Sequence, residues 1–305
     1  MRLTILTTTY NRIGLLHRCF ESLTDQAEDD FEWFVVDDGS TDETTRTVQE
    51  WQREAKFPIR LLSKENGGKH TALNAAIKEP LGDYVLFLDS DDALAPGAIQ
   101  RLKVLADECD QLSAAGIIGN RHALQDGGLV GSPIPPEVSL TTGRELRERY
   151  GVTGDTLRVY QAKILRRYPL PHFEGEQFLP ENIMFDQIDA AHRVLAAREV
   201  LYLCDYRPDG LSARILSHRA HSPHGFAVSL ESSAWISRNS WQVVRYTLKY
   251  QVWSRRFFGN YGRAAFRRRV AYYVCLPAAE LLYRLRKPAF IFDSYARARP
   301  DSEHL

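Results

Sequence analysis

Three aspartates within four residues are the strongest chemical signal in the sequence. Asp89, Asp91 and Asp92 directly follow the apolar run Tyr84–Leu88, which predicts a buried strand. Carboxylates this close repel one another unless a cation relieves the repulsion. Oxygen ligands suit Mg²⁺ or Mn²⁺, and Mg²⁺ prefers one or two carboxylates together with substrate phosphates. The cluster therefore predicts a divalent-metal site, with a solvated acidic turn before a helix near Pro96 as the alternative.

Polar residues also follow the other predicted strands. They form three short segments, Thr7–Asn11, Val36–Asp42 and Asn66–His70. The Asp38 carboxylate can accept hydrogen bonds from a nucleobase or a ribose, although its surroundings are also typical of a turn and helix N-cap. Gly67 and Gly68 allow close backbone approach, and Lys69 can face a diphosphate. His70 fits a structural role better than a catalytic one. Because ligands of open α/β sheets bind at the carboxyl ends of strands, these segments predict one shared site.

The elements that position these residues alternate regularly over the first 120 residues. Strands are predicted at Leu3–Thr9, Glu32–Val36, Ile59–Leu62, Tyr84–Leu88 and Ala115–Gly119. Helices are predicted at Ile13–Gln26, Asp42–Ala55, Thr71–Lys78 and Pro96–Asp110. This alternation predicts parallel pairing in an α/β sheet covered on both faces. Farther on, the predicted elements are helices at Leu140–Tyr150, Thr156–Arg167 and Asn182–His192, a strand at Val200–Cys204, and a helical end from Trp235 to Phe290.

In order and spacing, the polar segments resemble those of glycosyltransferase family 2. The residues that carry the resemblance are Thr8–Asn11, Val35–Asp42, Asn66–Lys69 and Gly82–Asp92. The resemblance is strong over residues 1–120 and looser to about residue 230. It implies an α/β, GT-A-like fold with a mixed, mostly parallel sheet flanked by helices, and an inverting reaction. Residues 1–230 would form the catalytic domain, with 1–120 as the nucleotide-sugar half and 121–230 as the acceptor half. Residues 231–305 would form a basic, aromatic-rich helical extension.

The resemblance implies roles for the polar groups near the strand ends. Thr9 and Asp38 would line the nucleoside pocket, with Asp38 reading the base. Asp89 and Asp91 would form an Asp-x-Asp pair for Mn²⁺ or Mg²⁺. Asp91 would be the more direct metal ligand and Asp89 the ribose or sugar contact, while Asp92 can take either role. The donor-binding residues implied together are Thr9, Tyr10, Asn11, Asp38, Gly68, Lys69, Asp89 and Ser90.

Inverting transfer also needs a carboxylate that takes the proton of the acceptor hydroxyl. Members of the family commonly place this base in an acidic pair at the start of a helix. Here Glu181 follows Pro180 before a predicted helix, but Asn182 stands where the second carboxylate is expected. Glu174 and Glu176 are alternatives for the base. Glu181 can also be an acidic residue that only stabilises the helix dipole.

A loop rich in basic residues follows the predicted strand at Val200–Cys204. Its first part, Tyr206–Ser212, resembles the segment before the mobile loop of polysaccharide-assembling members. Its remaining basic residues are Arg214, His218, Arg219, His221 and His224. They can close over a diphosphate or be ordinary loop residues.

The last quarter of the chain is basic and aromatic. Between Trp235 and Phe290, twelve Lys and Arg residues against Glu280 alone give a charge of +11, although the whole chain has a net charge of 0. Such a segment can bind an anionic membrane surface. It can also pack against the rest of the protein or form a dimer, with its arginines solvated. Nucleic acid is not expected as a partner. The sequence begins without a signal-peptide pattern, which predicts a cytoplasmic protein. The basic segment adds the prediction that the protein can attach peripherally to the inner face of the plasma membrane.

These observations predict sugar transfer from a nucleotide sugar to a glycan or lipid-linked glycan. A UDP-sugar is favoured over a GDP- or dTDP-sugar. A nucleotidylyltransferase would share the sheet and the metal chemistry, but Thr7–Arg12 lacks the Gly-rich phosphate loop of that class. A nucleotide-sugar-binding protein without turnover is the other rival, supported only by Asn182.

Overall fold

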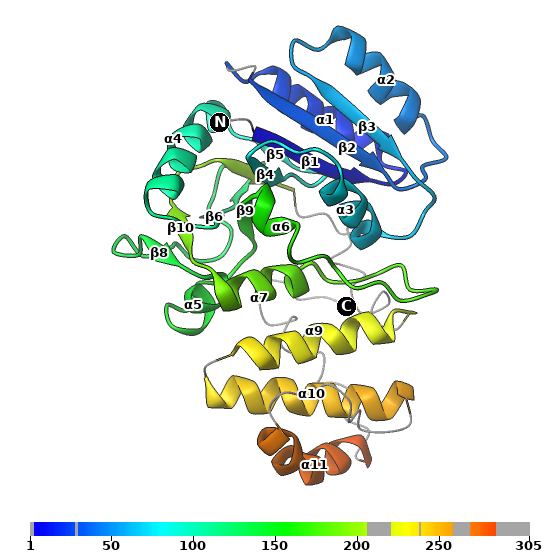
Figure 1. Cartoon of the computed structure of the whole chain (residues 1–305), viewed down its shortest axis with the longest axis vertical. Helices are drawn as coiled ribbons and strands as arrows, with labels where there is room; N and C mark the ends of the chain where they lie inside the picture. The colour runs from blue at the N-terminus through cyan, green and yellow to red at the C-terminus, as the bar shows by residue number, and fades with distance from the viewer. Residues whose placement is uncertain (1–2, 28–29, 206–220, 238, 259–268, 285–305) are drawn as a thin grey trace.

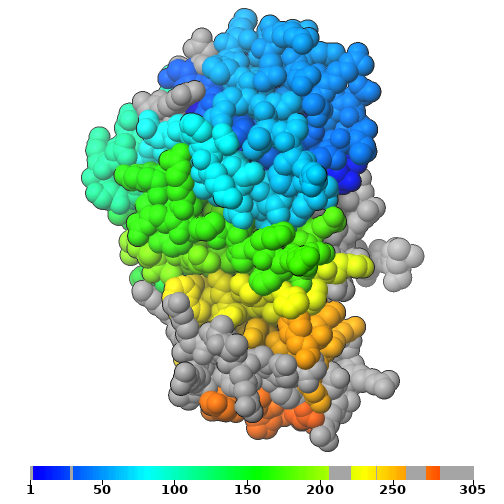
Figure 2. Space-filling view, turned by 45° about the vertical axis from the view of Figure 1, so that its right-hand side comes forward, coloured from blue at the N-terminus to red at the C-terminus, as the bar shows by residue number. Residues whose placement is uncertain are grey.

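The chain is arranged in layers that follow its order along the long axis of the molecule. A computed structural model describes residues 3–27, 30–205, 221–237, 239–258 and 269–284. The N-terminal strands and their helices lie at one end, and the C-terminal helices lie at the other (Figure 1). Figure 2 shows the same order on the surface, from the blue N-terminal part to the orange C-terminal part.

The first four strands form a parallel group on one side of the sheet. They are β1 (Leu3–Thr9), β2 (Phe31–Asp37), β3 (Ile59–Ser63) and β4 (Tyr84–Phe87). β1 lies between β2 and β4, and β3 lies outside β2, all in parallel. Thr9 pairs with Asp37, so the carboxyl ends of β1 and β2 lie side by side. The four predicted strands are confirmed to within one residue at each end.

The rest of the eight-stranded sheet is mixed, in the order β3-β2-β1-β4-β9-β6-β10-β8. Its strands are β6 (Gly116–Asn120), β8 (Leu140–Thr141), β9 (Thr156–Gln161) and β10 (Val194–Ala197). β9 runs antiparallel to both of its neighbours, β4 and β6. Because β4 and β6 both run antiparallel to β9, these two strands run in the same direction. The mixed sheet confirms the expected fold class.

Two predicted helices in this region need correction. The helix predicted at Thr156–Arg167 is wrong over its first part, which is β9, and only α6 (Ala162–Leu165) is helical. β9 lies in the centre of the sheet with five of its six residues buried, so it lacks the alternation of a half-exposed strand. The helix predicted at Leu140–Tyr150 starts later, as α5 (Gly143–Glu148), because Leu140 and Thr141 form β8.

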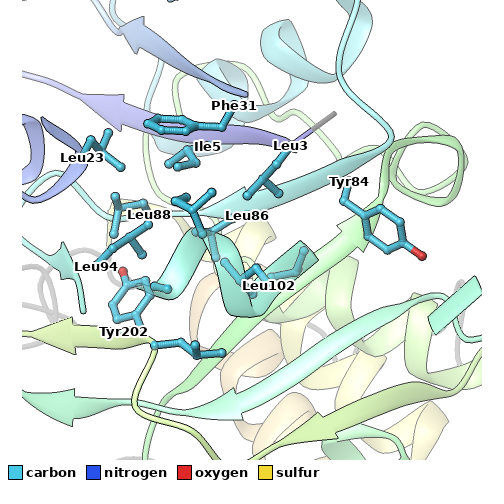
Figure 3. Close-up of a cluster of buried hydrophobic side chains, with 14 of the residues drawn as sticks. Leu3, Ile5, Leu23, Phe31, Tyr84, Leu86, Leu88, Leu94, Leu102 and Tyr202 are labelled. Carbon is cyan, nitrogen blue, oxygen red and sulfur yellow. The ribbon is translucent and has the colours of Figure 1, made fainter. Parts of the chain in front are cut away.

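Helices cover both faces of the sheet. One face carries α1 (Ile13–Thr24), α2 (Thr44–Glu54) and α4 (Ala98–Gln111). The other carries α3 (Lys69–Lys78), α5, α6 and α7 (Asn182–Ala191). Successive residues of one strand enter opposite cores, as Ile5 and Leu6 do. Figure 3 shows the first core, where Leu3, Ile5 and Leu86 of the strands lie near Leu102 of α4.

A second, three-stranded sheet lies beside the acidic cluster. It consists of β5 (Ala93–Leu94), β7 (His122–Ala123) and β11 (Tyr202–Cys204), in the order β5-β11-β7. β5 follows the three aspartates directly, and β11 pairs with it. This pairing brings the strand predicted at Val200–Cys204 next to the aspartates, although it is distant in sequence.

The C-terminal part is helical, as expected, and has a core of its own. Its described helices are α9 (Pro223–Ile236), α10 (Ser240–Phe258) and α11 (Arg269–Arg284). α9 packs between α7 and α10, and α10 packs on α11. Trp253 and Tyr250 are buried in this core, with Tyr246 and Phe257 against it, so these rings are not free to meet a membrane. Residue 230 lies inside α9, and the division of the chain into two domains there remains a prediction. Within the described ranges, no helix is long and apolar enough to cross a bilayer.

Candidate active site at the carboxyl ends of the strands

Asp89 and Asp92 share one arginine. Arg121 Nη1 donates to Asp89 Oδ2 at 3.1 Å and to Asp92 Oδ2 at 3.3 Å. The guanidinium lies over the Tyr202 ring, 4.3 Å from its centroid, and the Tyr202 hydroxyl donates to Asp92 Oδ2 at 2.7 Å. Lys69 Nζ donates to Asp89 Oδ1 at 2.6 Å. Both carboxylates are thus held by Arg121 just after β6, Tyr202 of β11 and Lys69 at the start of α3.

Burial and neighbouring charges separate the pKa values of these two carboxyl groups. Burial alone would raise the pKa of Asp89, but the charges of Lys69 and Arg121 outweigh it and hold this pKa well below its usual range. At Asp92, burial together with the charge of Asp89 raises the pKa to about 7. Burial opposes the charge on Lys69, yet the carboxylates of Asp89 and Glu181 raise the Lys69 pKa above its usual value. At neutral pH Asp89 is therefore ionised and Lys69 protonated.

Asp91 is partly exposed and is held by two arginines at the start of α1 and within it. Arg12 Nη1 donates to Asp91 Oδ2 at 3.1 Å, with the two side chains 27% and 18% exposed. Arg18 Nη1 donates to the Asp91 carbonyl oxygen at 3.2 Å and to Asp205 Oδ2 at 2.9 Å. The Asp205 amide donates to Asp92 Oδ1 at 3.0 Å. The acidic loop is therefore tied both to α1 and to the residue that follows β11.

Glu181 reaches the acidic cluster through Lys69. The Lys69 ammonium forms ion pairs with Glu181 Oε1 and with Asp89 Oδ1. Glu181 occupies the N-cap position of α7, but its carboxylate turns to Lys69 instead of capping that helix. Its side chain is 24% exposed, so it remains accessible from outside. The structure thus links the predicted base, through Lys69, to Asp89 of the predicted metal-binding pair.

Glu176 and Glu174, the two alternatives to Glu181 as the base, have different surroundings. Glu176 is buried, and its two oxygens accept from the amides of His224 and Gly225, each at 2.8 Å. It therefore holds the start of α9. Glu174 is exposed, and its position gives no contact with the aspartates in the described structure. Neither has the link to the acidic cluster that Glu181 has.

Asn182, which departs from the acidic pair of the family, is part of a helix–helix contact. Its Nδ2 donates to Asp186 Oδ2 at 3.1 Å, and its Oδ1 accepts from Ser229 Oγ at 3.0 Å. The bond with Ser229 joins α7 to α9, and the bond with Asp186 lies within α7. The side chain therefore has a structural use, while its neighbour Glu181 turns to the site.

Asp38 is engaged with the loop that follows β3. Its carboxylate is buried and accepts from the amides of Gly67 at 3.1 Å and Gly68 at 2.7 Å. Lys64 Nζ donates to it at 2.6 Å. Asp38 therefore stabilises the Gly-rich loop. Recognition of the donor's nucleobase by Asp38 remains a prediction.

Gly68 allows that loop to touch the segment that leads to Glu181. Its φ is +90°, and a Cβ there would collide with the carbonyl oxygen of Gln177. Gln177 Nε2 also donates to Asn66 Oδ1 at 3.0 Å. This close approach positions Lys69, the next residue, for its contact with Glu181.

The remaining predicted donor residues surround the end of β1. Asn11 has a φ of 50°, and its Oδ1 accepts from the Thr41 amide at 2.7 Å, which joins the ends of β1 and β2. Thr9 is buried, and its Oγ1 has no hydrogen-bond partner within the part of the chain that the structure describes. Tyr10 is 46% exposed and Ser90 is buried. Thr9 and Tyr10 thus offer a hydroxyl and a ring at the strand end.

Several residues of the site were not singled out in the sequence, namely Arg12, Arg18, Arg121, Tyr202 and Asp205. A signal existed for Arg121, because it follows a predicted strand and β6 ends at the same edge as β4. No comparable signal existed for Tyr202, which reaches the cluster only through the pairing of β5 with β11.

The basic loop before α9 is described only in its last residues. Arg214, His218 and Arg219 lie outside the described residues. His224, which was predicted in this loop, instead lies in the first turn of α9, and its ring Nδ1 lies 2.8 Å from Glu176 Oε1.

Comparison with known proteins agrees with this arrangement. Residues 4–187, more than half of the chain, match the profile described as Glycosyl transferase family 2. The poly(ribitol-phosphate) beta-N-acetylglucosaminyltransferase TarS of Staphylococcus aureus is 25% identical over 216 residues, which are 67% of this chain and 34% of TarS. The chain spans about a third of the length of the first curated relatives that it matches.

Solved structures share the fold. S. aureus TarS 1-349 in complex with UDP-GlcNAc matches with a TM-score of 0.58 and 18% identity, covering 98% of this chain and 88% of that chain. The mannosyltransferase PcManGT of Pyrobaculum calidifontis, in complex with GDP-Man and Mn²⁺, matches with a TM-score of 0.52 and 18% identity, covering 97% and 85%. At such identities the likeness shows a common GT-A fold. The profile match includes the ends of β1 to β4 and Glu181, and the chain belongs to glycosyl transferase family 2.

Proposed function

We propose that this protein transfers a sugar from a nucleotide-sugar donor to a hydroxyl of a glycan acceptor, with inversion at the anomeric carbon. The observation that carries the proposal is the contact of Lys69 with both Asp89 and Glu181. A carboxylate that can take a proton then lies beside a cluster that can hold a metal-bound diphosphate. Membership of the family supports sugar transfer as the reaction.

The cationic side chains of the site suit an anionic donor. Arg12, Arg18 and Lys69 are partly exposed, at 27%, 34% and 32%, and each already pairs with a carboxylate. In our proposal the donor diphosphate takes the place of these carboxylates as a partner of Arg12 and Lys69. The nucleoside then lies over the end of β1, with the Tyr10 ring against the base and Thr9 Oγ1 as a hydrogen-bonding group.

The residues fit a divalent cation that is held jointly with the donor. Among the described residues, no three His, Cys, Asp or Glu side chains form a complete metal cage. Mg²⁺ needs only one or two carboxylates when substrate phosphates supply further oxygens. Asp91, which is 18% exposed, and Asp89 would supply these carboxylates. When bound, the cation would neutralise charge on the departing diphosphate, and Mn²⁺ in the PcManGT structure supports this assignment.

Glu181 serves as the base in this proposal. It accepts the proton of the acceptor hydroxyl, which attacks the anomeric carbon from the side opposite the nucleotide and so inverts the configuration. Lys69 turns from Glu181 to the diphosphate and stabilises the negative charge of the leaving group. Glu176 is a poor alternative, because its oxygens are bound by the amides at the start of α9.

A UDP-sugar is the favoured donor, and a glycan or lipid-linked glycan is the favoured acceptor. The complex of TarS with UDP-GlcNAc and the activity in the name of TarS support this choice. Family membership argues against a nucleotidylyltransferase. Family membership also argues against a protein without turnover, for which the amide at Asn182 was the only support. We place the reaction at the cytoplasmic side of the plasma membrane.

The Asp91→Asn variant tests the proposal, with Asp107→Asn on the exposed surface of α4 as the matched control. Mn²⁺ should strengthen UDP binding to the wild type and to the control, measured by calorimetry, and the proteins should transfer sugar from UDP-GlcNAc. Asp91→Asn should lose both the Mn²⁺ effect and transfer. The anomer of the product, read by NMR, should be opposite to that of the donor. Full transfer by Asp91→Asn, or a product with retained configuration, would refute the proposal.

A further inference from the structure

The base segment, residues 176–181, leads directly to Glu181 and is held on one side by α9. The two carboxylate oxygens of Glu176 accept from amides in the first turn of that helix. The Phe178 amide donates to Ser222 Oγ, just before the helix, at 3.1 Å. These contacts fix one side of the base segment to the C-terminal helices.

The other side of the base segment touches the Gly-rich loop, residues 66–68, through Gln177. Gln177 Nε2 donates to Asn66 Oδ1 at 3.0 Å. A Cβ at Gly68 would collide with the Gln177 carbonyl oxygen and would lie 2.7 Å from the carbonyl carbon. Because these atoms belong to the backbone, no change of side-chain rotamer could relieve the collision. The contact therefore sets the distance between the loop and the base segment.

The Gly-rich loop is in turn fixed to the end of β2. The Asp38 carboxylate accepts from the amides of both glycines of the loop, and the Asp38 carbonyl oxygen accepts from Asn66 Nδ2 at 2.9 Å. A Cβ at Gly39 would lie 2.7 Å from the Asn66 amide nitrogen, so the loop also packs closely on the strand end. Through Gln177, the base segment is thus placed relative to the strand ends that form the proposed donor site.

Gly175, two residues before Gln177, shows that this close contact is specific. Its φ is +77°, near the +90° of Gly68, but a Cβ at Gly175 would meet no atom within 4 Å in the described part of the chain. The Gln177 side chain is exposed, so it buries little apolar area and adds little to the core. The contact of Gln177 with the Gly-rich loop therefore positions the base segment more than it stabilises the fold.

We propose that Gln177 is a positioning residue for Glu181. It keeps the base at the distance from the donor site at which an acceptor hydroxyl can lose its proton during attack. This role rests on the proposed function of Glu181 as the base. Displacing a reacting group by about 1 Å can cost on the order of 10²-fold in rate, so a small shift of the base segment should be measurable.

The first test is Gly68→Ala, which forces the Gly-rich loop and the base segment apart, with Gly175→Ala as the matched control. Both variants add a Cβ at a positive φ, but only Gly68→Ala collides with Gln177. The reaction is UDP release from UDP-GlcNAc with water as the acceptor, so no glycan is needed. Gly68→Ala should lower kcat on the order of 10–100-fold, while the donor KM and UDP affinity stay near those of the wild type. Gly175→Ala should keep the wild-type kcat.

The second test is Gln177→Ala, which changes an exposed side chain and leaves the backbone contact in place. It removes the hydrogen bond to Asn66, and kcat should fall about two- to tenfold. Gly68→Ala and Gln177→Ala are each combined with Glu181→Gln as well. If Gln177 acts through the base, neither change should lower the remaining rate of Glu181→Gln any further.

Three results would overturn the positioning role. They are a wild-type kcat in both Gly68→Ala and Gln177→Ala, an equal fall of kcat when Glu181 is already replaced, and a loss of UDP affinity as large as the loss of kcat. Wild-type UDP release by Glu181→Gln would overturn the assignment of the base as well. Failure of the positioning role alone can therefore be told apart from failure of the proposed function.

Discussion

Two clusters of carboxylates and basic groups in this protein have similar composition but different access to solvent. At the strand ends, Asp89 and Asp91 are 27% and 18% exposed. Between α7 and β9, the side chains of Asp186, Asp189 and Arg158 are 2%, 1% and 6% exposed. The first cluster leaves room for a ligand to exchange partners with the protein, and the second does not. Accessibility, more than residue type, separates a cluster that can do chemistry from one that holds the fold.

The buried cluster joins α5 and α7 to the sheet. Arg158 Nη1 lies 3.9 Å from Asp189 Oδ1 and donates to the Tyr160 hydroxyl at 2.9 Å. The Arg144 amide donates to Asp189 Oδ2 at 2.9 Å. A Cβ at Gly143 would collide with the Arg158 guanidinium, so the arginine is closely packed as well as paired. All partners in this cluster come from the protein itself.

The largest effect on stability is expected from Arg158→Met, which removes one member of the buried cluster. Asp189 would be left without its cationic neighbour in a buried position, and breaking such a pair costs about 3–5 kcal/mol of unfolding free energy. UDP affinity of the folded protein should stay near that of the wild type. Urea unfolding and UDP calorimetry measure the two quantities, with the exposed Arg46→Met as control. If Arg158→Met lowered UDP affinity without lowering the free energy of unfolding, the buried cluster would not be the purely structural one.

A smaller, pH-dependent effect is expected at Asp186. Burial, reinforced by the charge of Asp189, raises the pKa of Asp186 to about 6. A carboxyl group whose pKa is higher in the folded state than the unfolded value of about 3.9 binds its proton more tightly when folded. Its contribution to stability is therefore present below about pH 4 and is lost as pH rises through about 6.

The Asp186→Asn variant isolates this contribution, because its amide does not titrate and its oxygen can still accept from Asn182 and Ser233. At neutral pH it should be more stable than the wild type by about 3 kcal/mol, and the difference should vanish near pH 4. Urea midpoints recorded across this pH range provide the measurement. Parallel pH profiles for the two proteins would contradict the raised pKa.

Much of the site was predictable because its motifs are local. Asp38, Lys69 and Asp89 each follow a predicted strand, and parallel strands end at one edge of a sheet, so their proximity followed from topology. The contact of Glu181 with Lys69 was not predictable in this way. It depends on the close packing of Gly68 against Gln177, which no local pattern reveals.

The errors have physical causes of the same kind. β9 was assigned to a helix because a strand buried on both faces has no period of two. The stacking of Arg121 on Tyr202 joins segments that only the small sheet brings together. Several aromatic residues of the basic C-terminal segment, such as Trp253, pack inside it, which charge and composition do not indicate.

Glu181→Gln compared with Glu174→Gln tests the central claim most directly. The first variant removes the proposed base next to Lys69, and the second makes the same change on an exposed carboxylate nearby. Sugar transfer from UDP-GlcNAc should fall on the order of 10²–10⁴-fold in Glu181→Gln, while its UDP affinity and unfolding free energy stay close to those of the wild type. Glu174→Gln should transfer at the wild-type rate. Wild-type transfer by Glu181→Gln, or loss of transfer in Glu174→Gln alone, would contradict the assignment of Glu181 to the strand-end site.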